Sequence, residues 1–168
     1  MSRRLVLVAV VSLIVSVASA PPAVAAGTWL WPVTGPVIRG FDAPDDPYGS
    51  GHRGIDIAAP VGTPVLAVSS GTVTFAGSVG GELFVTIDHG GGLLSSSSWV
   101  SALQVRRGDV VARGQVIALS GGGHPNSAEP AHLHVGVRLN GSYVDPMAYL
   151  SPLSVAGLIR LAPLVAAA

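Results

Sequence analysis

The sequence predicts an all-β domain of the sandwich or barrel type, and three observations support that fold class. The chain has 168 residues, which is enough for a single domain with a hydrophobic core of its own. Its 22 glycines and 13 prolines interrupt it every few residues after the N-terminal segment. The runs between these breaks are short and rich in β-branched residues, and none keeps a helical 3.6-residue apolar period for three turns.

The N-terminal segment is typical of a secretory signal peptide. Arginines at positions 3–4 precede an apolar run at 5–11, and the segment closes on small residues at 23–26. The alternative is a transmembrane anchor, but the apolar run is short and ends at two prolines, residues 21–22. We therefore expect cleavage near residue 26, export from the cytoplasm, and no stable membrane span in the mature chain.

Composition excludes several classes of function. Loss of residues 1–26 removes two of the nine arginines and leaves all nine acidic residues, so the mature surface is slightly acidic. Such a surface has no basic patch for nucleic acid or anionic lipid. The chain has no cysteine, which rules out disulfides, a thiolate metal site and lipid attachment through a processed cysteine.

Short β-rich runs follow one another from residue 36 onward, and we predict a strand at each. A short turn is expected at 146–150, where a proline opens it. We place the β domain at residues 27–150 and interpret residues 151–168 as a final strand with an apolar tail. The predicted strands are residues 36–41, 64–68, 72–75, 83–88, 110–112, 116–120 and 132–139.

Two histidine motifs carry the candidate chemistry, and each follows a polar, turn-rich loop. The first is HRGID at residues 52–56, and the second is HLH at residues 132–134. In extended chain, residues separated by an even number share a face, so each motif can direct both its polar members into one cleft. Imidazole nitrogens and a carboxylate oxygen are suitable ligands for zinc. Spacing leaves open whether both histidines of the second motif bind one metal, or one binds while the other faces the metal-bound water.

The same motifs support a resemblance to a known family. GHRGIDIAAPVGTPVLAVSSGTVTFAG, DHGGG, VRRGDVVARGQVIALSG and AHLHVGVRLNGSYVDPMAYL occur in that order within residues 31–150. Together they resemble the lysostaphin-type (LytM-like, duplicated hybrid motif) zinc metallopeptidases of peptidoglycan. The resemblance implies a two-layer antiparallel β structure with a substrate groove. It also implies one Zn²⁺ held by His52, Asp56 and His134, with His132 facing the zinc-bound water as general base or as stabiliser of the tetrahedral intermediate.

The chain departs from the family pattern in one segment. Many members carry a further histidine in a Tyr-x-His-Leu stretch, and by spacing Trp99 occupies its place. The segment is more similar to an actinobacterial branch of the family, although only Val100 of that branch's Tyr-Glu-Pro-Val stretch is kept. His124 could replace the missing histidine or be an exposed loop residue. For His89 we favour a structural or groove-wall role over catalysis.

We therefore expect a secreted, extracellular or wall-associated zinc metalloendopeptidase that cuts cross-links or stem peptides of peptidoglycan. The alternative is a catalytically degenerate zinc-binding wall module that binds or regulates another peptidoglycan hydrolase, and hence has a cell-wall partner protein. A monomer is expected in either case. GTVTFAG and the 105–121 segment also resemble lipoyl and biotinyl carrier domains. Those domains attach their cofactor to lysine, and this chain has none.

Overall fold

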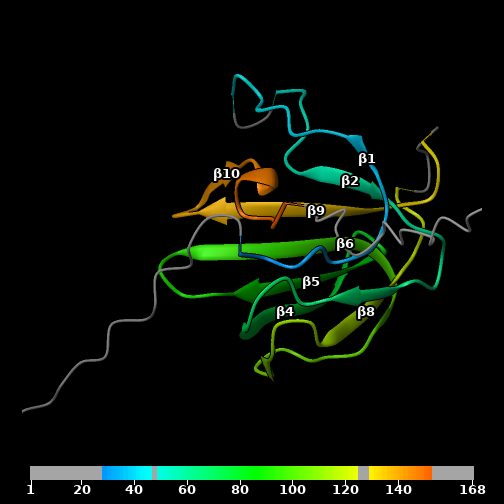
Figure 1. The fold of residues 1–168 in the computed structure, drawn as a ribbon, viewed down its shortest axis with the longest axis vertical. Coiled ribbons are helices and arrows are strands. Elements are labelled where there is room, and N and C mark those ends of the chain that lie inside the picture. The colour runs from blue at the N-terminus through cyan, green and yellow to red at the C-terminus, as the bar shows by residue number, and fades with distance from the viewer. Residues whose placement is uncertain (1–27, 47–48, 125–128, 153–168) are drawn as a thin grey trace, which may run out of the picture.

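The computed structural model describes residues 28–46, 49–124 and 129–152, which form an antiparallel β structure (Figure 1). No helix in these ranges is long and apolar enough to cross a membrane. The predicted all-β, antiparallel fold class is confirmed. The elements are β1 Val37–Arg39, β2 Ile55–Ala58, β3 Pro64–Leu66, β4 Gly71–Val79, β5 Glu82–Asp88, β6 Leu93–Leu103, β7 Val110–Val111, β8 Val116–Ser120, β9 His132–Leu139, β10 Ser142–Val144 and a 3₁₀ turn, η1, at Pro146–Ala148.

The main sheet has the order β1-β2-β9-β6-β5-β4-β7, with β10 added beside β9. The sheet divides along β6. This strand pairs with β9 as far as Ser98, opposite His134, and from Val100 onward it pairs with β8. β8 in turn pairs with β3. The buried side chains of these two strands pack against one face of the main sheet, so they form a second layer.

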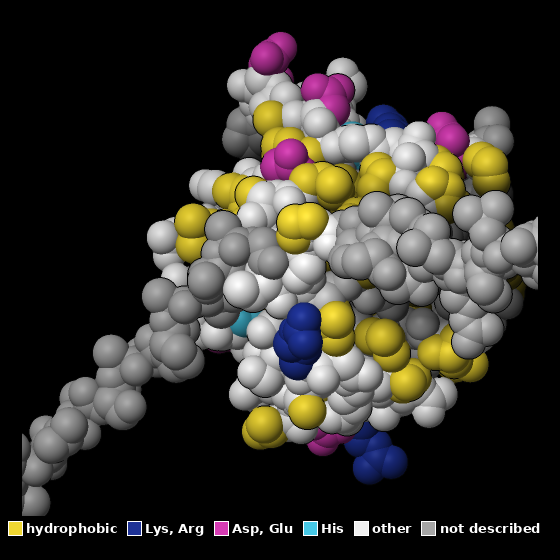
Figure 2. All heavy atoms as spheres, viewed as in Figure 1, with side chains coloured by type: hydrophobic (Ala, Val, Ile, Leu, Met, Phe, Trp, Pro, Cys, Tyr) yellow, Lys and Arg dark blue, Asp and Glu magenta, His cyan; other side chains and the backbone are white. Residues whose placement is uncertain are grey.

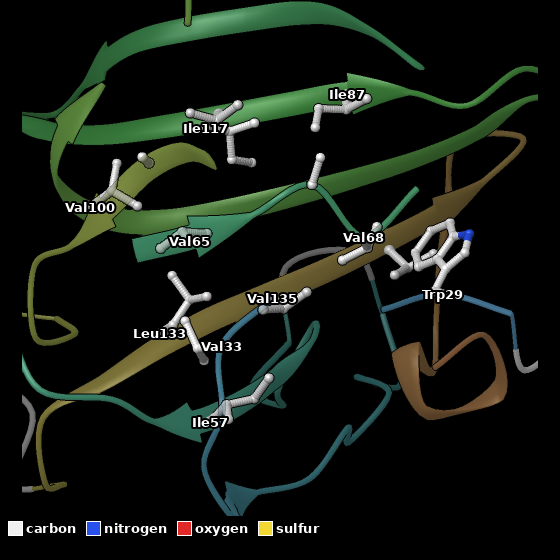
Figure 3. Close-up of a cluster of buried hydrophobic side chains, with 14 of the residues drawn as sticks. Trp29, Val33, Ile57, Val65, Val68, Ile87, Val100, Ile117, Leu133 and Val135 are labelled. Atoms are coloured by element: carbon white, nitrogen blue, oxygen red, sulfur yellow. The ribbon is translucent and has the colours of Figure 1, made fainter. Parts of the chain in front are cut away.

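The hydrophobic core lies between the two layers. Figure 3 shows Val65 of β3 and Ile117 of β8 in one cluster with Ile87, Leu133 and Val135 of the main sheet. Each fully buried side chain of this kind stabilises the fold by about 1.5–3 kcal/mol. Since side chains alternate along a strand, the residues between these core positions face the other side of the sheet.

The two ends of the described domain meet. Trp29 forms a parallel bridge with Leu150, directly after η1. Asp145 caps η1 by accepting a hydrogen bond at 2.9 Å from the backbone N–H of Met147. The turn predicted at 146–150 is therefore confirmed. The predicted signal peptide and most of the predicted C-terminal strand and tail, residues 153–168, lie outside the described residues.

All seven predicted strands overlap an observed one, but β2, β6 and β10 were not predicted. The largest omission is β6, which spans 11 residues and contains the serines at 95–98. Serine is not among the residues that are enriched in strands, so the local sequence gives little signal. This segment is a strand because β5 and β9 supply hydrogen-bond partners on both sides.

Candidate metal centre

Asp56 and His134 lie opposite each other on β2 and β9. Their sequence neighbours Ile55, Ile57 and Leu133 are fully buried on the core face, as the alternation predicts. The two polar side chains therefore share the other face of the sheet. His134 Nδ1 lies 2.8 Å from Asp56 Oδ1. Strand pairing alone thus brings one residue of each sequence motif into contact.

His52 reaches this pair from outside the sheet. It belongs to no strand, and the chain bends at residues 53–54 between it and β2. The predicted reason for its approach, strand parity with Asp56, is therefore wrong. Instead, His52 pairs through its backbone with Asp42, and its Nδ1–H donates to the Gly40 carbonyl at 2.6 Å. This bond aims Nε2 at Asp56 Oδ1 and His134 Nδ1, each 3.1 Å away.

The three atoms form a cluster that could hold a metal ion. Since the Nδ1 proton of His52 is used by Gly40, His52 Nε2 and Asp56 Oδ1 both present lone pairs to the same space. Two facing acceptors require a cation or a shared proton between them. Tetrahedral zinc with bonds of about 2.0–2.1 Å separates its ligands by roughly 3.3 Å, close to the spacing here. The donor set and its spacing both fit zinc.

The charge on Asp56 suits a ligand role. Burial alone would raise the pKa of its carboxyl group. The hydrogen bond from His134 and the positive charge available on His134, His52 and His132 outweigh burial and hold that pKa below its ordinary value. Asp56 is therefore ionised at neutral pH although its side chain is only 5% exposed.

His132 lies on the same face, two residues before His134, and is almost completely buried. Its Nδ1–H donates to the Pro130 carbonyl at 2.7 Å, which fixes the tautomer and leaves a lone pair on Nε2. Nε2 lies 3.9 Å from Asp56 Oδ2, beyond hydrogen-bond distance. His132 therefore stands beside the three-donor cluster with a free base nitrogen directed toward it.

Two glycines, which sequence reasoning passed over, leave the space that the histidine rings occupy. A Cβ on Gly54 would lie 2.3 Å from the Val135 carbonyl oxygen and 2.7 Å from His134 Nε2. A Cβ on Gly123 would lie 2.3 Å from the His132 ring, at a backbone φ of +94°. Gly54 lies inside the HRGID motif, whereas Gly123 lies nine residues before His132, so the sequence carried a signal at the first position and little at the second.

Trp99 closes one side of the centre. Trp99 is the extra residue of a β-bulge in β6, because Ser98 pairs with Phe84 of β5 and Val100 pairs with Leu83. Its φ of +55° is unusual for a bulky residue. Its ring centroid lies 5.1 Å from that of His134 and 6.4 Å from that of His132. His124 packs edge-on against the same indole at 5.5 Å. The segment that departs from the family pattern therefore borders the candidate site directly.

His89 lies apart from this centre. Its Nδ1–H donates to the Ser70 carbonyl at 2.8 Å, and its Nε2 accepts from the Ser95 hydroxyl at 2.8 Å. Its ring packs against Trp29 at 4.8 Å. Burial lowers the pKa of His89, against the raising effects of the Ser70 hydrogen bond and of Asp88. These contacts belong to the core side of β6 and give His89 a structural role.

A hollow of about 270 Å³ begins beside the centre and follows β6. Ser98, opposite His134, lines its near end, and Leu94 lines its far end. On the face seen in Figure 2, dark blue Lys and Arg side chains are few and separate, and no basic patch is visible. The hollow is lined by Phe75, Val79, Phe84, Thr86, Leu94, Ser96, Ser98, Arg138 and Tyr143.

Comparison with known proteins identifies the family. A sequence profile of peptidase family M23 matches residues 50–146, more than half of the chain, and the chain belongs to that family. The predicted resemblance to lysostaphin-type peptidases is thereby confirmed. The matched segment contains all four candidate site residues.

Individual relatives extend this finding. The uncharacterized protein Rv2891 of Mycobacterium tuberculosis is 40% identical over 169 residues, covering 96% of this chain and 66% of its own length. The murein hydrolase activator NlpD of Escherichia coli is 34% identical, covering 73% of this chain and 31% of its own. A zinc-containing peptidase from Vibrio cholerae has a TM-score of 0.62 and 28% identity, over 76% of this chain and 41% of its own. The chain thus spans less than two thirds of these relatives.

Proposed function

We propose that the protein is an exported zinc metalloendopeptidase that hydrolyses cross-links or stem peptides of bacterial peptidoglycan. The observation that carries the proposal is the convergence of His52 Nε2, Asp56 Oδ1 and His134 Nδ1 beside the free nitrogen of His132. Membership of peptidase family M23 and the likeness to a zinc-containing peptidase support the same reaction class.

Each residue has a definite task in this proposal. His52, Asp56 and His134 would hold one zinc ion, which when bound would polarise the scissile carbonyl and activate a water molecule. His132 Nε2 would accept a proton at this place and return it to the leaving amine. The carbonyls of Gly40 and Pro130 keep both imidazoles in the tautomer that this work requires.

The substrate class and location rest on other support. The relative NlpD is named for its action on murein hydrolases, so the substrate would lie in the wall. The predicted signal peptide at residues 1–26 would deliver the domain, residues 27–150, to that compartment. A monomer with one zinc ion is the expected working form.

A regulatory wall module is the second candidate, and Trp99 favours it. The indole covers a side of the centre where the family's resemblance leads us to expect a helper histidine. Loss of one oxyanion donor costs about 10²- to 10³-fold in rate while leaving metal binding intact. The relative NlpD is itself named as an activator rather than a hydrolase.

Release of peptides from purified sacculi by zinc-loaded protein separates the two candidates. We expect wild type to release peptides, His134→Ala to lose zinc and activity together, and His132→Ala to keep zinc and lose activity. A large rate gain in Trp99→His would identify Trp99 as the vacated helper position. If zinc-loaded wild type cuts no sacculus but stimulates a separate wall hydrolase, the enzyme proposal is wrong and the module is correct.

A further inference from the structure

The hollow along β6 has a single positive charge, at the end away from the metal centre. Of the nine residues that line it, Arg138 alone is charged, and the rest are aromatic, aliphatic or hydroxyl-bearing. Thr86 and Ser96 form a hydroxyl pair on its floor at 3.1 Å. Among the described residues that line the hollow, Arg138 is therefore the one charged group that a ligand would meet.

The guanidinium of Arg138 is held in place by the neighbouring strand. Arg138 pairs with Tyr143 of β10, and its guanidinium carbon lies 4.3 Å from the centroid of the tyrosine ring. A nitrogen of the same group donates to the Tyr143 hydroxyl. Stacking of this kind reduces the conformational freedom of arginine and leaves guanidinium N–H groups at its edge for a planar anion.

Two acidic residues lie at opposite ends of the hollow's margin. Asp88 is opposite Leu94, and Glu82 is opposite Val79, so both carboxylates belong to the hollow's face of the sheet. Asp88 is already used, because its Oδ1 accepts the Gly90 N–H at 2.8 Å. Glu82 lies beyond the row of Ser98 and His134, so a ligand carboxylate would be repelled at the metal-centre end and attracted at Arg138. Asp88 lies in the row of Arg138, on the β5 side of β6, so it favours a ligand carboxylate on the β9 side of the groove.

The distance between the metal centre and Arg138 determines where along the ligand a carboxylate must lie to reach Arg138. Ser98 faces His134 and Leu94 faces Arg138, and four residues of strand separate the two rows. At 3.3–3.4 Å per residue, that separation is about 13 Å. An extended peptide beside β6 would cover the same distance in about three to four residues.

We propose that Arg138, oriented by Tyr143, is a carboxylate subsite. It selects peptides with a free carboxyl group about three to four residues from the bond positioned at His52, Asp56 and His134. Arginine suits this task because its planar group can form two parallel hydrogen bonds to one carboxylate. The proposal rests on the proposed function only in taking a peptide as the ligand.

The test uses labelled hexapeptides of glycine and alanine that carry one glutamate or one glutamine at each position in turn. Binding to zinc-loaded protein is measured by fluorescence polarisation, and cleavage is measured separately as kcat and KM. We expect one glutamate position to lower Kd about 3- to 10-fold relative to glutamine, because this exposed guanidinium is partly screened by solvent. The preference should shrink as ionic strength rises.

Variants identify the group responsible. Arg138→Gln should abolish the glutamate preference, and Arg138→Lys should retain part of it. Tyr143→Phe should reduce it through KM or Kd without changing kcat, as expected for a positioning residue. Arg113→Gln removes an exposed arginine in the turn before β8 and serves as the matched control.

Each result decides the proposal. An equal effect of Arg138→Gln on glutamate and glutamine peptides would overturn it. So would equal binding of the two series by wild type, including no measurable binding of either. Wild type that prefers one glutamate position but releases no peptide from purified sacculi would retain the subsite and reject the endopeptidase.

Discussion

His52 and His132 at the candidate centre and His89 away from it share the same hydrogen bond at Nδ1 but differ at the second ring nitrogen. His52 and His132 each donate Nδ1–H to a backbone carbonyl, and so does His89. At His89, the second nitrogen is satisfied by Ser95, and Trp29 packs against the ring. At the candidate centre, the second nitrogens face other acceptors. The comparison shows that a fixed tautomer does not by itself define a metal site, whereas the convergence of several ligand atoms on one point does.

Removing the shared carboxylate should have the largest effect. Asp56→Ala takes away the one anion that His52, His132 and His134 all approach, and we expect zinc affinity to fall by about 10²- to 10³-fold or more. Competition with a chelator of known affinity measures this loss. Ser95→Ala is the matched control, because Ser95 contacts His89 and lies apart from the metal centre. It should leave zinc affinity unchanged and cost about 1–3 kcal/mol of stability, because His89 Nε2 loses its partner.

A methyl group at Gly54 should have the next largest effect. The added Cβ meets both the Val135 carbonyl and the His134 ring, so Gly54→Ala should destabilise the fold by about 3 kcal/mol. The displaced imidazole should also weaken zinc binding by about 10- to 100-fold. Gly40→Ala is the control, because nothing lies within 4 Å of its added Cβ. Equal stability and zinc affinity in the two variants would show that His134 is not confined as described.

The smallest effect is a pH dependence that belongs to His89. Because its pKa is lowered on folding, the unfolded chain binds a proton more readily, and stability falls as the pH drops through about 6.5. Denaturant unfolding of zinc-loaded protein at several pH values measures the slope. His89→Gln removes the group and should flatten the slope between neutral and mildly acidic pH. An unchanged slope would mean that His89 is not buried as a neutral base.

The sequence alone predicted much of the candidate site, but it predicted fewer of the strands and bends that position the site residues. The even spacing of His132 and His134 correctly predicted a shared face, because strand periodicity is a local property. The approach of His52 could not be derived in this way, since a bend and a carbonyl from residue 40 direct it. Strand β6 was missed because its serines gain their conformation from two neighbouring strands. The pairing of Arg138 with Tyr143 likewise depends on the β9–β10 register.

Zinc content of purified protein tests the central claim most directly. After exposure to zinc and gel filtration, mass spectrometry of the metal should find about one zinc per chain in wild type, in His132→Ala and in His89→Gln. It should find almost none in His52→Ala, Asp56→Ala and His134→Ala, provided that each variant elutes as folded protein. Zinc retained in those three variants, or absent from wild type, would contradict the metal centre described here.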